Sequence, residues 1–179
     1  MKVMFLDRDG VINEDTGHLY KVSDWIFTDN CLDALKTIVR KGFQIVIITN
    51  QAGIAKGYYS VEDYEALTDW YVGVLKKHNI SVLDVFYCPH HPQGEVKQFA
   101  KECMCRKPNP GMIEQALEKY EIDLEDSVLI GDKVSDVEAG FKAGVNNLVL
   151  LDSRYLLDER AVSFDVSHFS SLYDFSLTL

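Results

Sequence analysis

The sequence predicts an α/β fold, a three-layer Rossmann-like sandwich in which helices cover both faces of a mostly parallel sheet. Short apolar runs rich in β-branched residues, typical of strands buried on both faces, alternate along the chain with segments of helical periodicity. Strands that alternate with helices favour parallel pairing through right-handed crossovers. Several apolar runs end in polar residues, which would gather at one edge of such a sheet and form a ligand site there.

Length and composition predict one domain covering residues 1–179. A chain of 179 residues is long enough for one hydrophobic core and short for two. Its content of 47% hydrophobic and 26% charged residues is typical of a soluble globular protein. Asp7 interrupts the first apolar run before it reaches signal-peptide length, and no later run approaches the ~20 residues of a membrane span. We therefore expect a cytoplasmic protein with no membrane partner. We also expect a monomer.

The charge of the chain argues against binding to polyanions. The net charge of −10 repels nucleic acid and anionic membranes, so we expect no nucleic-acid partner. Four cationic residues nevertheless fall in the loops that carry the polar motifs described below: Arg8, Arg106, Lys107 and Lys133. The site itself is therefore expected to be positive although the molecule is acidic.

The first part of the chain predicts two strands with a helix between them. Residues 3–6 are apolar without a helical period, which indicates a buried strand. Asp29 or Asn30 is expected to cap a helix whose apolar residues share one face and which stops at Gly42. The β-branched run 43–48 predicts the second buried strand.

The middle of the chain predicts a long helix, a third strand and an irregular segment. Ser60 followed by Asp63 three residues later resembles a capping box that opens the helix. Residues 81–87 then predict the strand. Segment 94–107 has no clear period, and an irregular stretch of this length in a small domain needs something to hold it.

The last part of the chain continues the alternation. Asn109 as N-cap with Pro110 at the first helical position starts a further helix. The remaining predicted elements are a strand over 127–130, a helix from Val134 that stops at Gly144, a strand over 147–151, a weak strand at 164–166 and a short terminal helix near Leu172.

Polar residues follow three of the predicted strands at the edge where a ligand would bind. These residues are Asp7 and Asp9 after the first strand, Thr49 and Asn50 after the second, and Asp132 and Lys133 after the fourth. Two carboxylates as close as Asp7 and Asp9 repel each other, and a divalent cation, most often Mg2+, relieves that repulsion. An aspartate that merely caps the next helix is the alternative. Three strands with polar ends favour the metal site.

The acids at this edge indicate phosphoryl transfer. No Gly-rich loop follows the first strand, which disfavours a dinucleotide fold. Asp7, Asp9 and Asp132 supply carboxylates for Mg2+, and Lys107 or Lys133 would help to offset the charge of a phosphate. One of the two leading acids could attack phosphorus to form an aspartyl-phosphate. The other could protonate the leaving oxygen and then activate water.

Three further residues have candidate roles near the phosphate. The Thr49 hydroxyl, together with the Asn50 side chain or nearby amides, is placed to hold the equatorial phosphoryl oxygens. Asp136 lies one turn into a predicted helix, where it would either complement the helix dipole or orient Lys133 from outside the metal's own ligands. We favour the orienting role.

Three cysteines and a histidine predict a metal-clipped loop over 88–105. Cys88-x-His90 and, twelve residues later, Cys103-x-Cys105 supply a complete tetrahedral set for structural Zn2+. The clip would close the irregular segment that otherwise has no support. His91 is the rival imidazole. A zinc ion with four protein ligands leaves no position for water, so the site is expected to be structural and not catalytic.

Taken together, the motifs resemble those of the haloacid dehalogenase superfamily of aspartyl phosphatases. The matching residues are Asp7-Arg8-Asp9-Gly10, Thr49-Asn50, Lys107 and Gly131-Asp132-Lys133-x-x-Asp136, in that order. Within the superfamily, segments 53–57, 88–94 and 103–112 are similar to the D-glycero-D-manno-heptose 1,7-bisphosphate 7-phosphatase family. That family lacks a large cap domain, and here the spacers after the first and second strands are each largely filled by one predicted helix.

The resemblance implies a role for each matching acid. Asp7 would be the nucleophile and Asp9 the general acid/base. Asp132 would bind Mg2+ together with both of them, Asp9 through its carbonyl oxygen. The resemblance also implies Zn2+ at the same Cys88, His90, Cys103 and Cys105 set.

The resemblance also implies contacts with substrate. Thr49 and Lys107 would steady the phosphoryl group, and Arg106 would recognise the substrate. The pocket would be lined by Asp15, Thr16, Gly17, His18, Thr49, Asn50, Gln51, Ala52 and Lys133.

The resemblance implies that the protein is a phosphoric monoester hydrolase that acts on a small phosphorylated sugar. It would remove the 7-phosphate of heptose 1,7-bisphosphate in the synthesis of nucleotide-activated heptose for lipopolysaccharide. A histidinol-phosphate phosphatase, which shares the zinc clip and the acid pair, or another small phosphomonoester phosphatase, is the alternative. A zinc-dependent nucleic-acid-binding module belongs to a different class and is disfavoured by the net charge and by the absence of a basic aromatic surface.

Overall fold

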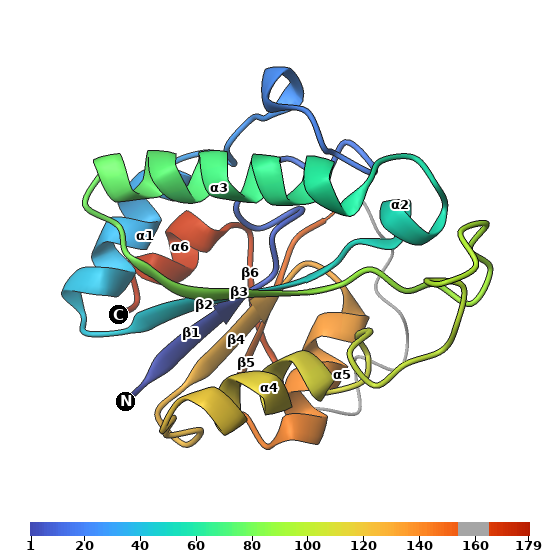
Figure 1. The fold of residues 1–179 in the computed structure, drawn as a ribbon. Coiled ribbons are helices and arrows are strands. Elements are labelled where there is room, and N and C mark those ends of the chain that lie inside the picture. Colours follow the sequence, from blue (N-terminus) through green and yellow to red (C-terminus); the bar gives the residue numbers. More distant parts are fainter. Residues whose placement is uncertain (154–164) are drawn as a thin grey trace.

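A single parallel sheet forms the centre of the molecule (Figure 1), whose computed structural model describes residues 1–153 and 165–179. Its six strands have the order β3-β2-β1-β4-β5-β6, and every neighbouring pair is parallel. The strands are β1 (Val3–Leu6), β2 (Gln44–Asn50), β3 (Val82–Cys88), β4 (Val128–Gly131), β5 (Asn147–Leu151) and β6 (Ser167–Phe169). The predicted α/β fold with a mostly parallel sheet is confirmed.

Helices cover both faces of this sheet, as Figure 1 shows. The helices are η1 (Val22–Asp24), α1 (Cys31–Arg40), α2 (Ala52–Ala55), α3 (Val61–Lys77), α4 (Gly111–Lys119), α5 (Val134–Ala143) and α6 (Leu172–Ser176). Helices α1, α3 and α6 pack on one face, and α4 and α5 pack on the other. The segments after β1 and β2 hold little beyond α1 and α3, so no large cap domain is inserted there.

The central position of β1 explains its composition. Each residue of Val3–Leu6 is completely buried, because β2 and β4 flank the strand and helices cover it from both sides. The backbone N–H of Asp7 donates to Ile130 O at 3.0 Å, which continues the pairing with β4 by one residue. The strand therefore delivers Asp7 to a fixed position at the carboxyl edge.

The long helix α3 begins as its sequence predicts. Ser60 Oγ accepts from the Asp63 backbone N–H at 3.0 Å, and Asp63 Oδ2 accepts from the Ser60 backbone N–H at 2.9 Å, a complete capping box. The buried stripe of this helix comprises Tyr64, Leu67, Tyr71 and Leu75. None of the helices in the described part of the chain has the length and apolar character needed to span a bilayer.

The strands predicted over 43–48, 81–87 and 127–130 are observed one or two residues further along the chain, and the boundaries of α4 and β6 differ as well. Helix α4 begins at Gly111 with Pro110 as N-cap, one residue later than predicted. The predicted strand at 164–166 is wrong: Asp165 and Val166 precede the strand, which is β6, and Phe164 lies outside the described residues. A strand of only three residues at the edge of the sheet forms because it pairs with β5. Such pairing between distant segments cannot be predicted from the local sequence.

The irregular segment between β3 and α4 is packed tightly against the start of α4. Gly111 donates its backbone N–H to Met104 O at 2.9 Å. A Cβ at Gly111 would lie 2.5 Å from the same oxygen, closer than atoms of real structures approach. Only glycine therefore allows the loop to lie against the helix here.

We expect Gly111→Ala to lower the free energy of unfolding by roughly 1–3 kcal/mol, because the new methyl group would collide with backbone atoms of the loop, which cannot easily move aside. The matched control is Gly73→Ala in α3, where nothing lies within 4 Å of the new methyl group. Helix propensity should make that variant more stable by up to about 1 kcal/mol. Urea unfolding measures both, and equal stability of the two variants would contradict the close packing.

Candidate active site

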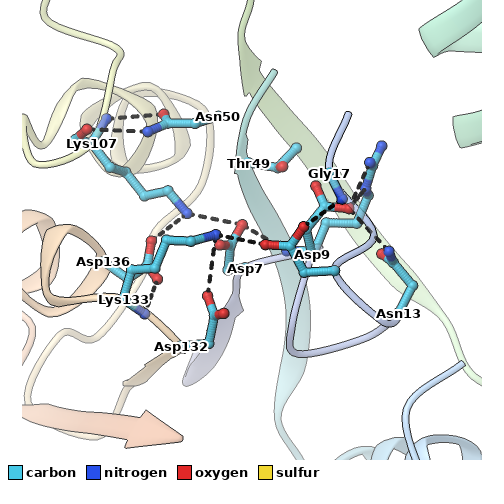
Figure 2. A network of polar contacts seen from close by, with 12 residues as sticks. Asp7, Asp9, Asn13, Gly17, Thr49, Asn50, Lys107, Asp132, Lys133 and Asp136 are labelled. Atoms are coloured by element: carbon cyan, nitrogen blue, oxygen red, sulfur yellow. Dashed lines mark hydrogen bonds and ion pairs between the residues drawn. The ribbon is translucent and has the colours of Figure 1, made fainter. Parts of the chain in front are cut away.

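The carboxyl edge of the sheet brings together three buried aspartates: one follows β1, one follows β4 and one lies in the first turn of α5. Asp7, Asp132 and Asp136 each offer a carboxylate oxygen, and these oxygens lie within 4.8 Å of one another. All three side chains are almost fully buried. Figure 2 shows them converging with Lys107 and Lys133, which come from different parts of the chain. The predicted carboxyl edge of the sheet therefore does bring several charged side chains together.

Lys107 is the buried cation of this cluster. Its Nζ lies 3.0 Å from Asp7 Oδ1 and 2.7 Å from Asp136 Oδ1, and it donates to Ile48 O at 2.9 Å. These acceptors match the three N–H groups of an ammonium. Burial opposes the charged form, but Asp136 and Asp7 outweigh it and raise the pKa of Lys107 above its ordinary value. The ammonium is thus fixed beside the Asp7 carboxylate.

Asp136 holds Lys107 and also caps helix α5. Its Oδ2 accepts from the backbone N–H of Lys133 at 3.0 Å, while Oδ1 pairs with Lys107. A Cβ at Gly131 would overlap Asp136, so the glycine at the end of β4 makes room for it. Sequence reasoning favoured Asp136 as an orienter of Lys133. The contact with the Lys133 backbone exists, but the charged partner of Asp136 is Lys107.

Asp132 has the least satisfied carboxylate of the site. Its Oδ1 is buried and has no hydrogen-bond partner among the described residues, and Lys133 Nζ lies 3.6 Å away. Burial and the charge of Asp7 raise the pKa of Asp132 to about 8. Burial likewise raises the pKa of Asp7 to about 6, although Lys107 opposes the shift. Two buried carboxylates that resist ionisation form a site in which a divalent cation would be stable.

The turn after β1 places its loop directly over Asp132. Gly10 has φ +87°, a conformation that favours glycine. A Cβ at Gly10 would overlap the Asp132 carboxylate. The loop backbone and the carboxylate can therefore face the same small volume, as a shared metal site requires.

The Asp9 carboxylate lies outside the cluster of three aspartates. Its Oδ1 accepts from Arg8 Nη2 at 2.8 Å and from Asn13 Nδ2 at 3.0 Å, and its Oδ2 accepts from Gln51 Nε2 at 3.2 Å. Arg8 is fully buried, with its guanidinium 5.9 Å from the Trp25 ring centre and Nη2 donating to Leu19 O. The positive charge that we expected Arg8 to bring to the site is therefore buried and paired with Asp9.

Residues at the end of β2 support the site through buried hydrogen bonds. Thr49 is completely buried, and its Oγ1 accepts from Gln51 Nε2 at 2.8 Å. Asn50 uses both ends of its amide on the backbone of Lys107, accepting from its N–H and donating to its O, each at 3.1 Å. We predicted Asn50 as a possible phosphate ligand. In the structure it docks the segment that carries Lys107.

The predicted substrate residues lie around the rim. Asp15 pairs with Lys133 at 3.1 Å and lines a cavity of about 430 Å³ next to Asp132. Arg106 donates to His90 O at 3.3 Å and lines a second cavity of about 600 Å³. The others are Thr16, Gly17 and His18, which are exposed, and Ala52, which is half-buried at the start of α2.

Sequence reasoning missed two residues of this network. Asn13 supports Asp9 from four residues further along the chain, and Tyr59 donates to Gln51 Oε1 at 2.5 Å. The spacing of Asn13 after Asp9 in a polar loop was a weak signal. Tyr59 gave none, because it belongs to a tyrosine-rich stretch that reads as core.

The predicted cysteine and histidine ligands also come together. Cys88 Sγ lies 3.4 Å from Cys103 Sγ and 3.1 Å from Cys105 Sγ, and His90 Nδ1 lies 3.4 Å from Cys105 Sγ. The four ligand atoms fit around one metal ion. His91 does not join them; its Nδ1 accepts from the Gln93 N–H.

Comparison with known proteins agrees with this geometry. A family model described as HAD-hydrolase-like matches residues 104–164. A D-glycero-alpha-D-manno-heptose-1,7-bisphosphate 7-phosphatase from Photorhabdus laumondii is 51% identical over 159 residues, which cover 89% of this chain and 87% of that protein. The chain belongs to the heptose-bisphosphate phosphatase family.

Further relatives extend the likeness. The D-glycero-beta-D-manno-heptose-1,7-bisphosphate 7-phosphatase of Escherichia coli K12 is 40% identical over 83% of this chain and 78% of that protein. The crystal structure of the D,D-heptose 1,7-bisphosphate phosphatase of B. bronchiseptica, complexed with magnesium and phosphate, matches with TM-score 0.83 and 28% identity, over 99% of this chain and 97% of that one. The superfamily and the enzyme class predicted from sequence, a phosphoric monoester hydrolase, are confirmed.

Proposed function

We propose that this member of the heptose-bisphosphate phosphatase family removes the 7-phosphate of D-glycero-D-manno-heptose 1,7-bisphosphate through an aspartyl-phosphate. The observation that carries the proposal is the buried Asp7 carboxylate at the end of β1, held 3.0 Å from Lys107 and next to Asp132. The names of the Photorhabdus and Escherichia relatives support the substrate. The product would be a heptose 1-phosphate for lipopolysaccharide precursor synthesis.

Mg2+ would be held by Asp7, Asp132 and the backbone carbonyl of Asp9. The donors are all oxygens, which Mg2+ prefers, and Asp132 Oδ1 has no hydrogen-bond partner among the described residues. When bound, the ion would neutralise the carboxylates and stabilise negative charge on the phosphoryl oxygens. The magnesium and phosphate in the B. bronchiseptica structure support this assignment.

The first step would transfer the phosphoryl group to Asp7. A carboxylate oxygen of Asp7 forms a bond to phosphorus as the bond from phosphorus to the sugar oxygen breaks, and Asp9 gives its proton to that oxygen. Lys107 stays beside Asp7 throughout, where its charge stabilises the developing phosphoryl charge. Because Thr49 Oγ1 accepts from Gln51, its own hydrogen is available to a phosphoryl oxygen.

The second step would release phosphate. Asp9, now a carboxylate, takes a proton from water as the water oxygen attacks phosphorus, and the bond between phosphorus and Asp7 breaks. Asp9 is thereby protonated again and Asp7 is restored. Arg106 and Lys133 would bind the rest of the anionic substrate.

The metal loop would hold a structural Zn2+ at Cys88, His90, Cys103 and Cys105. Three thiolates and one imidazole form a common tetrahedral zinc set. Arg106 and Lys107 follow the last ligand directly, so the ion would fix both over the site. None of the four cysteines forms a disulfide, which suits a reducing cytoplasm. We propose that the protein acts there as a monomer without a nucleic-acid partner.

Phosphate release distinguishes the proposed substrate from its rival. We expect the protein, with Mg2+ present, to have a kcat/KM for heptose 1,7-bisphosphate at least about tenfold above that for histidinol phosphate, because the substrate of a closely similar relative is the sugar. Activity on each anomer should be measured separately. Preference for histidinol phosphate would reject the assignment.

Asp7→Asn should reduce turnover by at least about a thousandfold, because the amide cannot form the acyl-phosphate. The fold and the metal loop should survive, since the side chains are nearly equal in size. Measuring phosphate release, together with circular dichroism and zinc content, tests this expectation. Activity close to that of the wild type would exclude covalent catalysis by this residue.

Cys103→Ser should lower zinc content and reduce the melting temperature by roughly 10 °C, because the loop loses its cross-link. His91→Ala is the matched control, since His91 lies in the same loop without joining the cluster. Atomic absorption and thermal unfolding measure both effects. An unaltered melting temperature for Cys103→Ser would contradict a structural metal.

A further inference from the structure

A chain of hydrogen bonds leads from Tyr59, which has no role so far, through Gln51 to Asp9, the proposed proton donor. We propose that Tyr59, acting through Gln51, positions the Asp9 carboxylate for proton transfer. Because it acts through another side chain, Tyr59 is a positioning residue. The inference rests on the proposed function, since that function assigns the proton to Asp9. Its support comes from the direction of each hydrogen bond.

The two oxygens of the Asp9 carboxylate have different surroundings. Oδ1 accepts from Arg8 at Nη2 (2.8 Å) and Nε (3.3 Å) and from Asn13 Nδ2 (3.0 Å). A carboxylate oxygen offers about two lone pairs, so Oδ1 is already saturated. Oδ2 accepts only from Gln51 among the described residues, at 3.2 Å, and retains room for a proton. Proton transfer therefore passes through the oxygen that Gln51 holds.

Tyr59 fixes which end of the Gln51 amide faces that oxygen. The Tyr59 hydroxyl donates to Gln51 Oε1 at 2.5 Å, which leaves Nε2 to donate to Asp9 and to Thr49 Oγ1 at 2.8 Å. In the flipped amide, Oε1 would face the carboxylate and repel it. Gln51 is only 2% exposed, so bulk water does not replace the tyrosine as donor.

Tyr59 itself is held rigidly as a donor. The side chain is 6% exposed, and its ring stacks on that of Tyr20 with centres 5.2 Å apart. A Cβ at Gly53 would overlap the Tyr59 ring, so this glycine gives the ring its place. Burial raises the pKa of Tyr59 well above its ordinary value, and the hydroxyl keeps its proton. The hydroxyl therefore retains the hydrogen that it donates to Gln51 Oε1.

The test is Tyr59→Phe, which removes one oxygen and preserves the ring. We expect kcat for heptose 1,7-bisphosphate to fall roughly 10–100-fold, a part of what general acid–base catalysis supplies, with KM changed by less than about threefold. p-Nitrophenyl phosphate has a leaving group that needs little protonation, so its kcat/KM should fall much less. Any effect through Thr49 acts on both substrates and cancels in their ratio.

Two variants calibrate the measurement. Tyr64→Phe removes the same group from a neighbouring buried ring, whose hydroxyl has no hydrogen-bond partner among the described residues, and should keep kcat unchanged. Asp9→Asn removes the proton donor and should cause the same selective loss on the sugar substrate. If Tyr59→Phe fails to fold, Gln51→Met removes the middle of the chain and should give the same selectivity.

The inference is overturned if kcat of Tyr59→Phe stays within about threefold of Tyr64→Phe, or if both substrates slow by the same factor. A wild-type protein that hydrolyses neither substrate, or an Asp9→Asn variant without selective loss, would instead reject the proposed function. Should the wild type hydrolyse only the bisphosphate, the kcat and KM of Tyr59→Phe against Tyr64→Phe decide the matter.

Discussion

The buried ion pairs of one ammonium group hold the candidate active site together. Lys107 Nζ lies between Asp7 and Asp136 and is almost fully removed from water. An isolated charge in that position would be very unfavourable, as would either carboxylate without it. The three groups therefore stabilise one another in the buried site. The end of β1, the start of α5 and the loop before α4 are joined by this one contact.

Sequence predicted the frame of the site because the frame depends on local pattern. The strands β1, β2 and β4 are central, so their residues must be apolar on both faces and their polar ends must share one edge. The predicted metal loop was equally accessible to sequence reasoning, because the spacing and chemistry of its Cys and His residues can be read directly from the chain. The structure accordingly brings Asp7 close to Asp132, and Cys88 and His90 close to Cys103 and Cys105.

The supporting contacts were not predictable in the same way. The Asn50 side chain forms its hydrogen bonds with the backbone of Lys107, 57 residues further along the chain. The Asp136 carboxylate forms its ion pair with the Lys107 ammonium, although Lys133 is much closer in sequence. These choices depend on how α4 and α5 pack on the sheet, which no local pattern reports. Arg8 and Tyr59 illustrate a second limit, because their hydrogen bonds to Asp9 and Gln51 depend on burial that the sequence does not reveal.

The double hydrogen bond between Asn50 and Lys107 has a consequence for how this family can diversify. It joins a side chain of β2 to a backbone N–H and C=O, which every residue type except proline supplies. The segment between Cys88 and Cys103 can therefore vary in length and sequence while Lys107 stays beside Asp7. Such variation would alter the surroundings of the site and leave its buried ion pairs in place.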